Sequence, residues 1–346
     1  MTKAVALLSG GLDSTLAVKL MIAQGIDVYA LNFTSSFCTC SAGAKKVPDG
    51  TLPEGGCKSA AKQVAEEFGV PLKVMLKGAE YIEIVRKPKH GYGKGINPCL
   101  DCRIYMFTLA KKYMEEIGAS FIITGEVLGQ RPMSQRSDTF PLIDTESGLE
   151  GLILRPLSAK HLAPTIPEKE GLVDREKLLD MLGRTRRPQM KLADDLDIGD
   201  YPCPSGGCLL TDKIFSKKVR DLFKHKKDVS GKDLQILKVG RHLRVDGVKI
   251  IIGRHEADNK RLKSLIQDGH TFLEPVDFSG PSAVVELSTE STEDNNILET
   301  AASIMLRYAN KAEGPATVLA TCDGKSREMT VDTPFDEDLI KEANLC

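Results

Sequence analysis

The segment that decides the fold is Ser9-Gly10-Gly11-Leu12-Asp13-Ser14. It follows an apolar run, residues 4–8, that reads as a short buried strand, and it precedes residues 15–22, which read as a helix. A glycine-rich turn between a strand and a helix directs backbone N–H groups and the helix N-terminus at an anion. The pattern predicts a phosphate site to which the serine hydroxyls add donors and in which Asp13 holds the Mg²⁺ of a nucleotide.

The two glycines of this segment let the backbone approach phosphate oxygens without a Cβ in the way. No lysine follows them, so the segment is not the G-x-x-x-x-G-K-[ST] loop. We predict that the whole segment contributes to nucleotide binding: Ser9, Gly10, Gly11, Leu12, Asp13 and Ser14. The alternative is an ordinary strand–helix turn that contains glycine.

The first part of the chain alternates strands and helices. The patterns predict strands at 28–33, 71–76 and 121–124 and helices at 58–68 and 100–117. Such alternation is typical of an α/β fold with an open, mostly parallel sheet and helices on both faces. Ligands of these sheets bind beyond the carboxyl ends of the strands. We therefore expect Asn32, Phe33 and Gly125 to lie beside the glycine-rich segment.

Length and composition set the broad class of the protein. The 346 residues, 41% hydrophobic and 27% charged, fit a globular chain of two domains, and no apolar run is long enough to span a bilayer. The chain enters a strand almost at once, so we expect no signal peptide and a cytoplasmic location. We predict a nucleotide domain at 1–165, a linking extension at 166–211 with a helix at 174–182, and a smaller α+β domain at 212–346.

The net charge of −1 conceals a strong asymmetry. Residues 213–263 carry 16 Lys and Arg against six Asp and Glu, whereas residues 264–346 carry five against 16. A basic block of this size indicates a surface that binds a polyanion. The candidate contacts are Lys217, Lys218, Lys224, Arg241, Arg244 and Arg254. For a single lysine, the ordinary explanation is a solvated surface.

Four of the nine cysteines have a spacing that indicates chemistry. Cys99 and Cys102 form a C-x-x-C pair at the start of a predicted helix, and Cys203 and Cys208 follow about 100 residues later. The helix dipole favours thiolate at the first pair. Three thiolates suit an iron–sulfur cluster with one open iron, four thiolates suit a closed zinc site, and two suit a catalytic disulfide. We predict a [4Fe-4S] cluster whose third ligand is Cys203 or Cys208, with Cys99, Cys102 and Cys203 as catalytic candidates.

A second group of cysteines lies in and after a long polar loop. Cys38, Cys40 and Cys57 can bind metal, accept sulfur as a persulfide, or be reduced thiols without a role. The sequence leaves these alternatives open.

Further motifs carry a resemblance to a known family. Residues 123–130, which end in Gln130, together with Ser134-Gln135 and residues 154–157, resemble the catalytic domain of tRNA 4-thiouridine synthetases, with the glycine-rich segment as their PP-loop. The chain is more distantly similar to tRNA 2-thiouridylases. The resemblance implies an ATP pyrophosphatase fold and Gln130 as a further ATP contact. It also implies a C-x-x-C with a distant cysteine as cluster ligands.

The chain departs from the 4-thiouridine synthetases in its RNA-binding module. No THUMP module is expected before residue 1, and residues 240–255 instead resemble the RNA-binding NFACT-R domain. The target nucleotide therefore stays open. The resemblance implies that the protein thiolates tRNA, with sulfide or a persulfide carrier such as a cysteine desulfurase as the sulfur donor.

Two other functions compete with this interpretation. A 7-cyano-7-deazaguanine synthase has the same kind of loop, but its compact zinc site and lack of an RNA domain fit this chain less well. A non-catalytic protein that binds RNA or the ribosome would not need Asp13 or the paired cysteines. Pyrophosphate release from ATP separates it from an enzyme.

Overall fold

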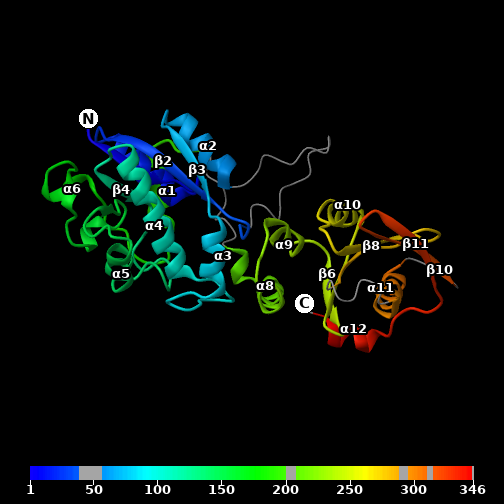
Figure 1. Cartoon of the computed structure of the whole chain (residues 1–346). Coiled ribbons are helices and arrows are strands. Elements are labelled where there is room, and N and C mark those ends of the chain that lie inside the picture. The colour runs from blue at the N-terminus through cyan, green and yellow to red at the C-terminus, as the bar shows by residue number, and fades with distance from the viewer. Residues whose placement is uncertain (39–56, 200–207, 288–294, 310–314, 345–346) are drawn as a thin grey trace. The chain divides into compact units, whose positions relative to one another are not determined.

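The computed structural model describes residues 1–38, 57–199, 208–287, 295–309 and 315–344. The chain divides into two compact units, Met1–Thr211 and Asp212–Cys346, which Figure 1 colours from blue to green and from green to red. The finer division at residue 165 stays a prediction. None of the helices in these ranges is long and apolar enough to cross a membrane.

The first unit is built on a five-stranded parallel sheet in the order β3-β2-β1-β4-β5. The strands are β1 (Lys3–Leu7), β2 (Asp27–Thr34), β3 (Leu72–Leu76), β4 (Phe121–Thr124) and β5 (Ile153–Leu154). The strand order reverses at β1, because β2 and β3 extend from one side of it and β4 and β5 from the other. The predicted open parallel sheet is confirmed, and its carboxyl edge at β1 and β4 is the expected place for a ligand.

Helices cover both faces of this sheet because successive side chains of β1 point to opposite faces. Ala4 and Ala6 pack with residues of α1 (Leu12–Ile22) and α2 (Cys57–Glu67). Val5 and Leu7 pack with residues of α4 and α5. The remaining elements are α3 (Ala79–Arg86), α4 (Cys99–Glu116), α5 (Thr139–Glu146), α6 (Ile166–Lys169), α7 (Arg187–Asp195) and 3₁₀ turns at Ala159–His161, Arg175–Lys177 and Leu209–Thr211.

The helix predicted at 174–182 is wrong. Only the short turn Arg175–Lys177 forms there. Beyond it the backbone is extended: Leu179 N donates to Pro156 O at 2.9 Å, and Met181 N donates to Leu157 O at 2.8 Å. Leu178 and Met181 enter apolar clusters of the first unit. Their spacing imitates a helix, but pairing with the segment after β5 overrides that local pattern.

The second unit has a six-stranded antiparallel sheet in the order β11-β10-β8-β9-β7-β6. Side chains of α11 pack against residues such as Ile250 and Ile252, and Leu262 of α10 packs against Ile251 and Val284. The predicted α+β character is confirmed. Its strands are β6 (Arg241–Val245), β7 (Val248–Ile252), β8 (His270–Pro275), β9 (Ala283–Glu286), β10 (Ala316–Cys322) and β11 (Lys325–Val331), and its helices are α8 (Lys213–His225), α9 (Gly231–Ile236), α10 (Glu256–Ser264), α11 (Asn295–Arg307) and α12 (Glu337–Ala343).

Candidate active site

The glycine-rich segment is a compact turn held by its own hydroxyl groups. Ser14 Oγ donates to Gly11 O at 2.8 Å and lies 3.0 Å from Ser9 Oγ. The amide of Ser9 donates to Ser14 Oγ at 3.2 Å. Helix α1 begins at Leu12, and no side chain among the described residues caps it. The first amides of α1 are therefore available to an anion.

Two glycines allow backbone segments to meet at this turn. Gly10 has a φ of +74°, and a Cβ there would lie 2.5 Å from the backbone carbon of Ala60 in α2. At Gly125, directly after β4, a Cβ would lie 2.4 Å from the backbone carbon of Asp13. Both distances are too short for any side chain. The end of β4 is thus pressed against the turn, as the expected position of Gly125 requires.

A cavity of about 290 Å³ opens at the carboxyl ends of β1, β2 and β4. Most of the predicted ATP contacts line it: Ser9, Asp13, Ser14, Asn32, Phe33, Gly125 and Gln130. Leu12 differs, because its side chain is buried in an apolar cluster with Leu16 and Val127. Only the backbone of Leu12 can therefore contact a nucleotide.

Several buried acceptors in this cavity lack a donor. Asp13 Oδ1, Asn32 Oδ1 and Gln135 Oε1 accept no hydrogen bond from the described residues. The other atoms of two of these side chains are fixed, since Gln130 Nε2 donates to Asp13 Oδ2 at 3.1 Å and Asn32 Nδ2 donates to Leu8 O at 2.8 Å. A buried acceptor without a partner costs free energy. These atoms therefore mark positions where a bound cation or ligand donor would be stabilised.

Cationic side chains surround the same cavity. Arg186 lies 3.7 Å from Asp13 Oδ2, and Arg103 lies 3.4 Å from Glu126 Oε1. Lys77 and Arg131 also line the cavity. Sequence reasoning missed Lys77, Arg131 and Arg186. Lys77 directly follows β3 and Arg131 directly follows Gln130, so their places in the sequence could have predicted a position at the carboxyl edge of the sheet. No sequence feature predicts such a position for Arg186.

Four thiols also line this cavity and form what we call its thiol wall: Cys38, Cys99, Cys102 and Cys208. The C-x-x-C pair begins α4, as predicted. Cys203 lies outside the described residues, as does Cys40. The proximity of Cys38 to the other three was not predicted, although its place just after β2 is a signal for the same edge.

The described residues do not gather these thiols into a metal site. Within those ranges, no three or more His, Cys, Asp or Glu side chains lie close enough together to hold a metal ion. The donors have the soft chemistry that an iron–sulfur cluster or zinc requires, but the predicted ligand Cys203 lies outside the described residues, so neither group is tested. The cluster, the zinc site and the catalytic disulfide stay predictions.

The charges around the thiols differ from one sulfur to the next. Lys77 Nζ lies 3.3 Å from Cys102 Sγ, where its positive charge can stabilise a negatively charged sulfur. The same Nζ lies 4.2 Å from the centre of the Tyr81 ring. Burial, followed by the nearby sulfurs of Cys102 and Cys208, raises the pKa of the Tyr81 hydroxyl. Burial also raises the pKa of Cys208 to about 11, which keeps it a thiol at neutral pH.

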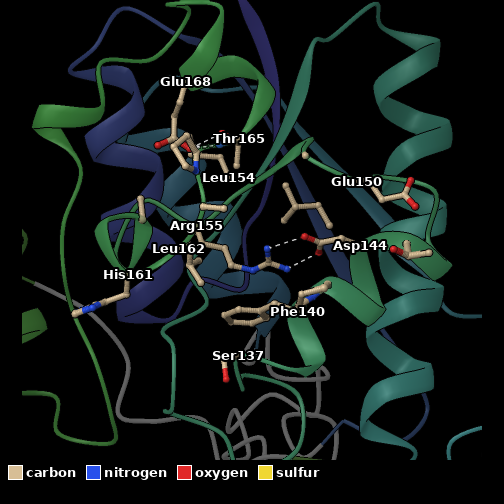
Figure 2. A pocket seen from close by; sticks show the side chains of 17 residues that line it. Ser137, Phe140, Asp144, Glu150, Leu154, Arg155, His161, Leu162, Thr165 and Glu168 are labelled. Atoms are coloured by element: carbon tan, nitrogen blue, oxygen red, sulfur yellow. Dashed lines mark hydrogen bonds and ion pairs between the residues drawn. The ribbon is translucent and has the colours of Figure 1, made fainter.

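A second, larger cavity of about 420 Å³ lies beside β5 and α5 (Figure 2). Its lining includes Arg155, whose guanidinium binds Asp144 at 2.7 and 3.1 Å and lies over the Phe140 ring at 4.0 Å. Arg155 Nε also donates to Glu126, which lines the first cavity, at 3.2 Å. This cavity contains neither the glycine-rich turn nor the thiols. We therefore take the smaller cavity as the candidate active site.

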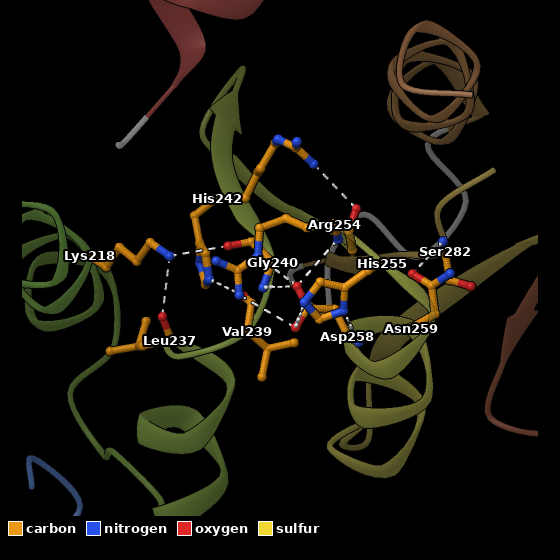
Figure 3. Close-up of polar contacts among 12 residues, drawn as sticks. Lys218, Leu237, Val239, Gly240, His242, Arg254, His255, Asp258, Asn259 and Ser282 are labelled. Atoms are coloured by element: carbon orange, nitrogen blue, oxygen red, sulfur yellow. Dashed lines mark hydrogen bonds and ion pairs between the residues drawn. The ribbon is translucent and has the colours of Figure 1, made fainter. Parts of the chain in front are cut away.

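The second unit contains the predicted RNA contacts, and two of them are already engaged by other groups of the protein. Lys218 is only 7% exposed, and its Nζ donates to Leu237 O and Gly240 O at 3.3 Å each (Figure 3). Arg244 makes a bidentate ion pair with the buried Asp221 at 2.6 Å. Burial of Lys218 corrects the expectation that it binds phosphate, whereas Arg244 is half-buried and its role in RNA binding stays a prediction.

The other predicted contacts remain accessible to different degrees. Arg254 is exposed but pairs with Asp258 at 2.7 Å, and the guanidinium of Arg241 stacks over the Tyr308 ring at 4.5 Å. Lys217 and Lys224 are exposed on α8, where they join Lys213 and Arg220. The spacing of 4, 3 and 4 residues places Lys213, Lys217, Arg220 and Lys224 on one helix face, which we call the α8 basic stripe.

Comparison with known proteins finds a similarity for part of each unit. Residues 1–162 match the family model described as thiamine biosynthesis protein (ThiI), and residues 240–342 match the NFACT protein RNA binding domain. A probable tRNA sulfurtransferase of Methanothermobacter thermautotrophicus is 33% identical over 156 residues, which are 45% of this chain and 36% of that protein. The tRNA-specific 2-thiouridylase MnmA of Clostridium acetobutylicum is 32% identical over 139 residues, which are 36% of this chain and 35% of that protein.

The chain thus spans about a third of the length of these curated relatives. A solved 4-thiouridine synthetase–RNA complex with bound ATP is 21% identical, with a TM-score of 0.35, over 57% of this chain and 52% of its own. The two sequence matches do not overlap, and each falls within one unit. Residues 1–162 of the chain are thus similar to the ThiI family, and residues 240–342 are similar to the NFACT RNA binding domain.

Proposed function

We propose that this chain is an ATP-dependent tRNA sulfurtransferase, which adenylates a carbonyl oxygen of a uridine and replaces it with sulfur. One observation carries the proposal: the glycine-rich turn and four thiols line the same cavity of the unit that is similar to the ThiI family. Adenylation needs the turn, and sulfur transfer needs a thiol or a sulfide held nearby. A single cavity with both serves the two steps in succession.

The turn is the proposed site of the ATP phosphates. We expect the free amides of α1 and the hydroxyls of Ser9 and Ser14 to bind them, with the adenine against Asn32 and Phe33. The unpartnered Oδ1 of Asp13 fits a Mg²⁺ ligand, because carboxylate oxygen is the donor that this ion prefers. A Mg²⁺ bound there would shield the phosphate charges during attack.

The proposed reaction has two steps. The uridine carbonyl oxygen attacks the α-phosphorus, and the bond to the bridging oxygen breaks as pyrophosphate leaves. Cationic groups at the cavity, Arg131 and Arg186 among them, are expected to stabilise the departing charge. A sulfide sulfur then attacks the activated carbon, and AMP leaves with the original oxygen. Where the donor is a persulfide, its outer sulfur makes this attack, and a second thiol then attacks the inner sulfur, so that the S–S bond breaks, the thiocarbonyl is released and a disulfide remains.

The sulfur is expected to arrive at the thiol wall from sulfide or from a persulfide carrier protein. Lys77 is suited to stabilise a negatively charged sulfur at Cys102, from which it lies 3.3 Å away. No step requires the iron–sulfur cluster. Whether Cys203 completes such a cluster is a separate question, for which iron analysis of anaerobically purified protein is the measurement.

RNA is expected to bind the second unit through its phosphates. The NFACT match supports this partner, and the α8 basic stripe adds four exposed cations outside that match. Phosphate contacts position an RNA without reading its sequence, and a uridine must leave its stack to enter the cavity. We propose Lys217, Lys224, Arg241 and Arg254 as contacts, together with Lys213 and Arg220.

The test is mass spectrometry of nucleosides from tRNA of the source organism, with and without the gene. We expect one thiouridine species to disappear and to return with the wild-type gene but not with Asp13→Asn. The identity of that species separates 4-thiouridine from 2-thiouridine. Loss of a deazaguanine nucleoside instead would assign the rival synthase reaction, and no change in any modified nucleoside would contradict catalysis on tRNA.

A further inference from the structure

Two cysteines that lie 170 residues apart in sequence face each other at the edge of the candidate active site. Cys38, after β2, and Cys208 form an isolated antiparallel β-bridge. The amide of Leu209 donates to Phe37 O at 3.0 Å, so the hydrogen bond lies beside the two cysteines rather than between them. This pattern makes Cys38 and Cys208 a non-hydrogen-bonded pair.

The geometry of such a pair suits a disulfide. Residues at non-hydrogen-bonded antiparallel positions have Cα atoms about 4.5 Å apart and side chains on the same face. Disulfides span Cα separations of about 4.4–6.8 Å. Cys208 Sγ already points across the bridge, 3.7 Å from Phe37 O, and Cys38 Sγ lies 3.5 Å from Ser35 Oγ. Rotation of side chains would suffice to join the sulfurs.

Both thiols are also accessible to small reagents. Cys38 and Cys208 are each half-buried and both line the open cavity of the first unit. A reagent that enters the cavity therefore meets two thiols on adjacent backbone segments. The other two thiols of the wall, Cys99 and Cys102, lie on one helix and make different contacts, with Ser134 and Lys77 respectively.

We propose that Cys38 and Cys208 are a redox pair that closes into a disulfide at the edge of the active site. The oxidant is a low-molecular-weight disulfide. One cysteine displaces a thiol from it to give a mixed disulfide, and the second displaces the other thiol, so two protein thiols lose two hydrogens and one small disulfide becomes two thiols. The bond ties the end of β2 to the turn before α8.

The consequence for catalysis rests on the proposed function. A Cys38–Cys208 disulfide removes two of the four thiols that line the cavity and leaves only Cys99 and Cys102. Sulfur transfer should therefore slow, because fewer thiols are available to receive sulfur, while the glycine-rich turn, which contains neither cysteine, should still bind ATP. Reduction would restore the site, which makes the pair a reversible switch.

The experiment uses the full-length chain, reduced and then exposed to oxidised glutathione. Remaining thiols are alkylated, and peptides are mapped by mass spectrometry. We expect a peptide that links Cys38 to Cys208 and two fewer alkylated thiols among the nine, with both changes reversed by dithiothreitol. A predominant link between Cys99 and Cys102, a link from Cys38 or Cys208 to any other cysteine, or no link would overturn the proposal.

Matched variants separate the pair from general oxidation. Cys38→Ser and Cys208→Ser should each abolish the linked peptide, while Cys322→Ser in β10 should retain it. Circular dichroism of the reduced variants checks their folding. Because linkage is measured without RNA, it can succeed even if no thiouridine forms. If the disulfide-linked protein thiolates tRNA as fast as the reduced protein does, the disulfide does not control the activity.

Discussion

The candidate active site of the first unit and the Asp221 site of the second unit treat their buried polar groups in opposite ways. In the first unit, Asp13 Oδ1 and Asn32 Oδ1 are buried without a hydrogen-bond donor among the described residues, and both line one cavity. In the second unit, the buried Asp221 is paired with Arg244 at 2.6 Å and with Lys249 at 3.4 Å. Burial opposes ionisation of Asp221, but these two cations hold its pKa below its ordinary value.

This difference distinguishes polar groups that can bind a ligand from polar groups that stabilise the fold. An unpartnered buried atom costs stability, so it persists where binding requires it. A buried charge with close partners is already satisfied and has little to offer a ligand. The contrast predicts that substitutions of the unpartnered groups in the cavity lower the reaction rate with little effect on stability. Substitutions of paired buried charges should lower stability instead.

The largest expected effect is loss of chemistry at Asp13. Asp13→Asn removes the carboxylate charge while the amide group retains its size, so folding should be preserved. We expect pyrophosphate release in the presence of tRNA to fall on the order of 10³-fold, about 4 kcal/mol. Asp27→Asn is the matched control. Asp27 begins β2, at the end of the sheet away from the cavity, so this substitution should leave the rate unchanged. Equal rates for wild type and Asp13→Asn would break the contrast.

The next effect is loss of stability at Arg155. Arg155→Met leaves Glu126 and Asp144 without their shared cation, and Glu126 is only 2% exposed. Asp144 would lose both of its hydrogen bonds to Arg155 and Glu126 would keep only Arg103, so the free energy of unfolding should fall by about 3 kcal/mol. Hydrogen exchange at the amides of β4 measures this locally. Arg136→Met removes an exposed ion pair with Asp138 and should cost less than about 0.5 kcal/mol.

A smaller effect concerns pH and the second unit. Burial, followed by the charges of Lys218 and Lys249, holds the pKa of His242 well below its ordinary value, so the folded state keeps the ring neutral (Figure 3). The unfolded chain binds a proton near pH 6.5, and stability is therefore lost as pH falls below that value, at about 1.4 kcal/mol per pH unit.

Hydrogen exchange at β6 and β7 between pH 5 and pH 7 measures this dependence. His242→Leu should remove the contribution of His242 to the slope of unfolding free energy against pH. The contribution of His270, whose pKa is also lowered by burial, should remain. The control is His255→Asn, because His255 is exposed and caps α10 through its side chain, a role that asparagine can fill. An unchanged slope in His242→Leu would contradict the assignment.

Local patterns sufficed to predict the parallel sheet and the active-site edge. The alternation of strands with helices and the Ser9–Ser14 segment each report a local preference, and the carboxyl-edge rule then brings Asn32 and Gly125 to the turn. Pairing over long range has no such signal. Nothing local in the sequence places Cys38 opposite Cys208, and nothing local favours extended backbone at Leu179, which pairs with the segment after β5.

The misplaced RNA contact is a different kind of error, because the sequence did contain the needed signal. Lys218 lies three residues after Phe215 and four before Leu222, so it belongs to the buried face of α8. The total charge of residues 213–263 does not distinguish buried from exposed lysines, so it does not reveal this periodicity. The same periodicity assigns Lys217 to the exposed face.

Adjacent lysines of α8 therefore provide the sharpest small-effect comparison. Lys217→Gln should weaken RNA binding a few-fold and lower the slope of log affinity against log salt by about 1, without loss of stability. Lys218→Gln should instead cost about 1–3 kcal/mol of stability, since Leu237 O and Gly240 O lose a charged donor, and the folded fraction should bind RNA with an unchanged salt slope. Binding titrations at several salt concentrations and thermal unfolding measure both. If both variants changed the salt slope equally, burial would not separate structural from binding cations in this unit.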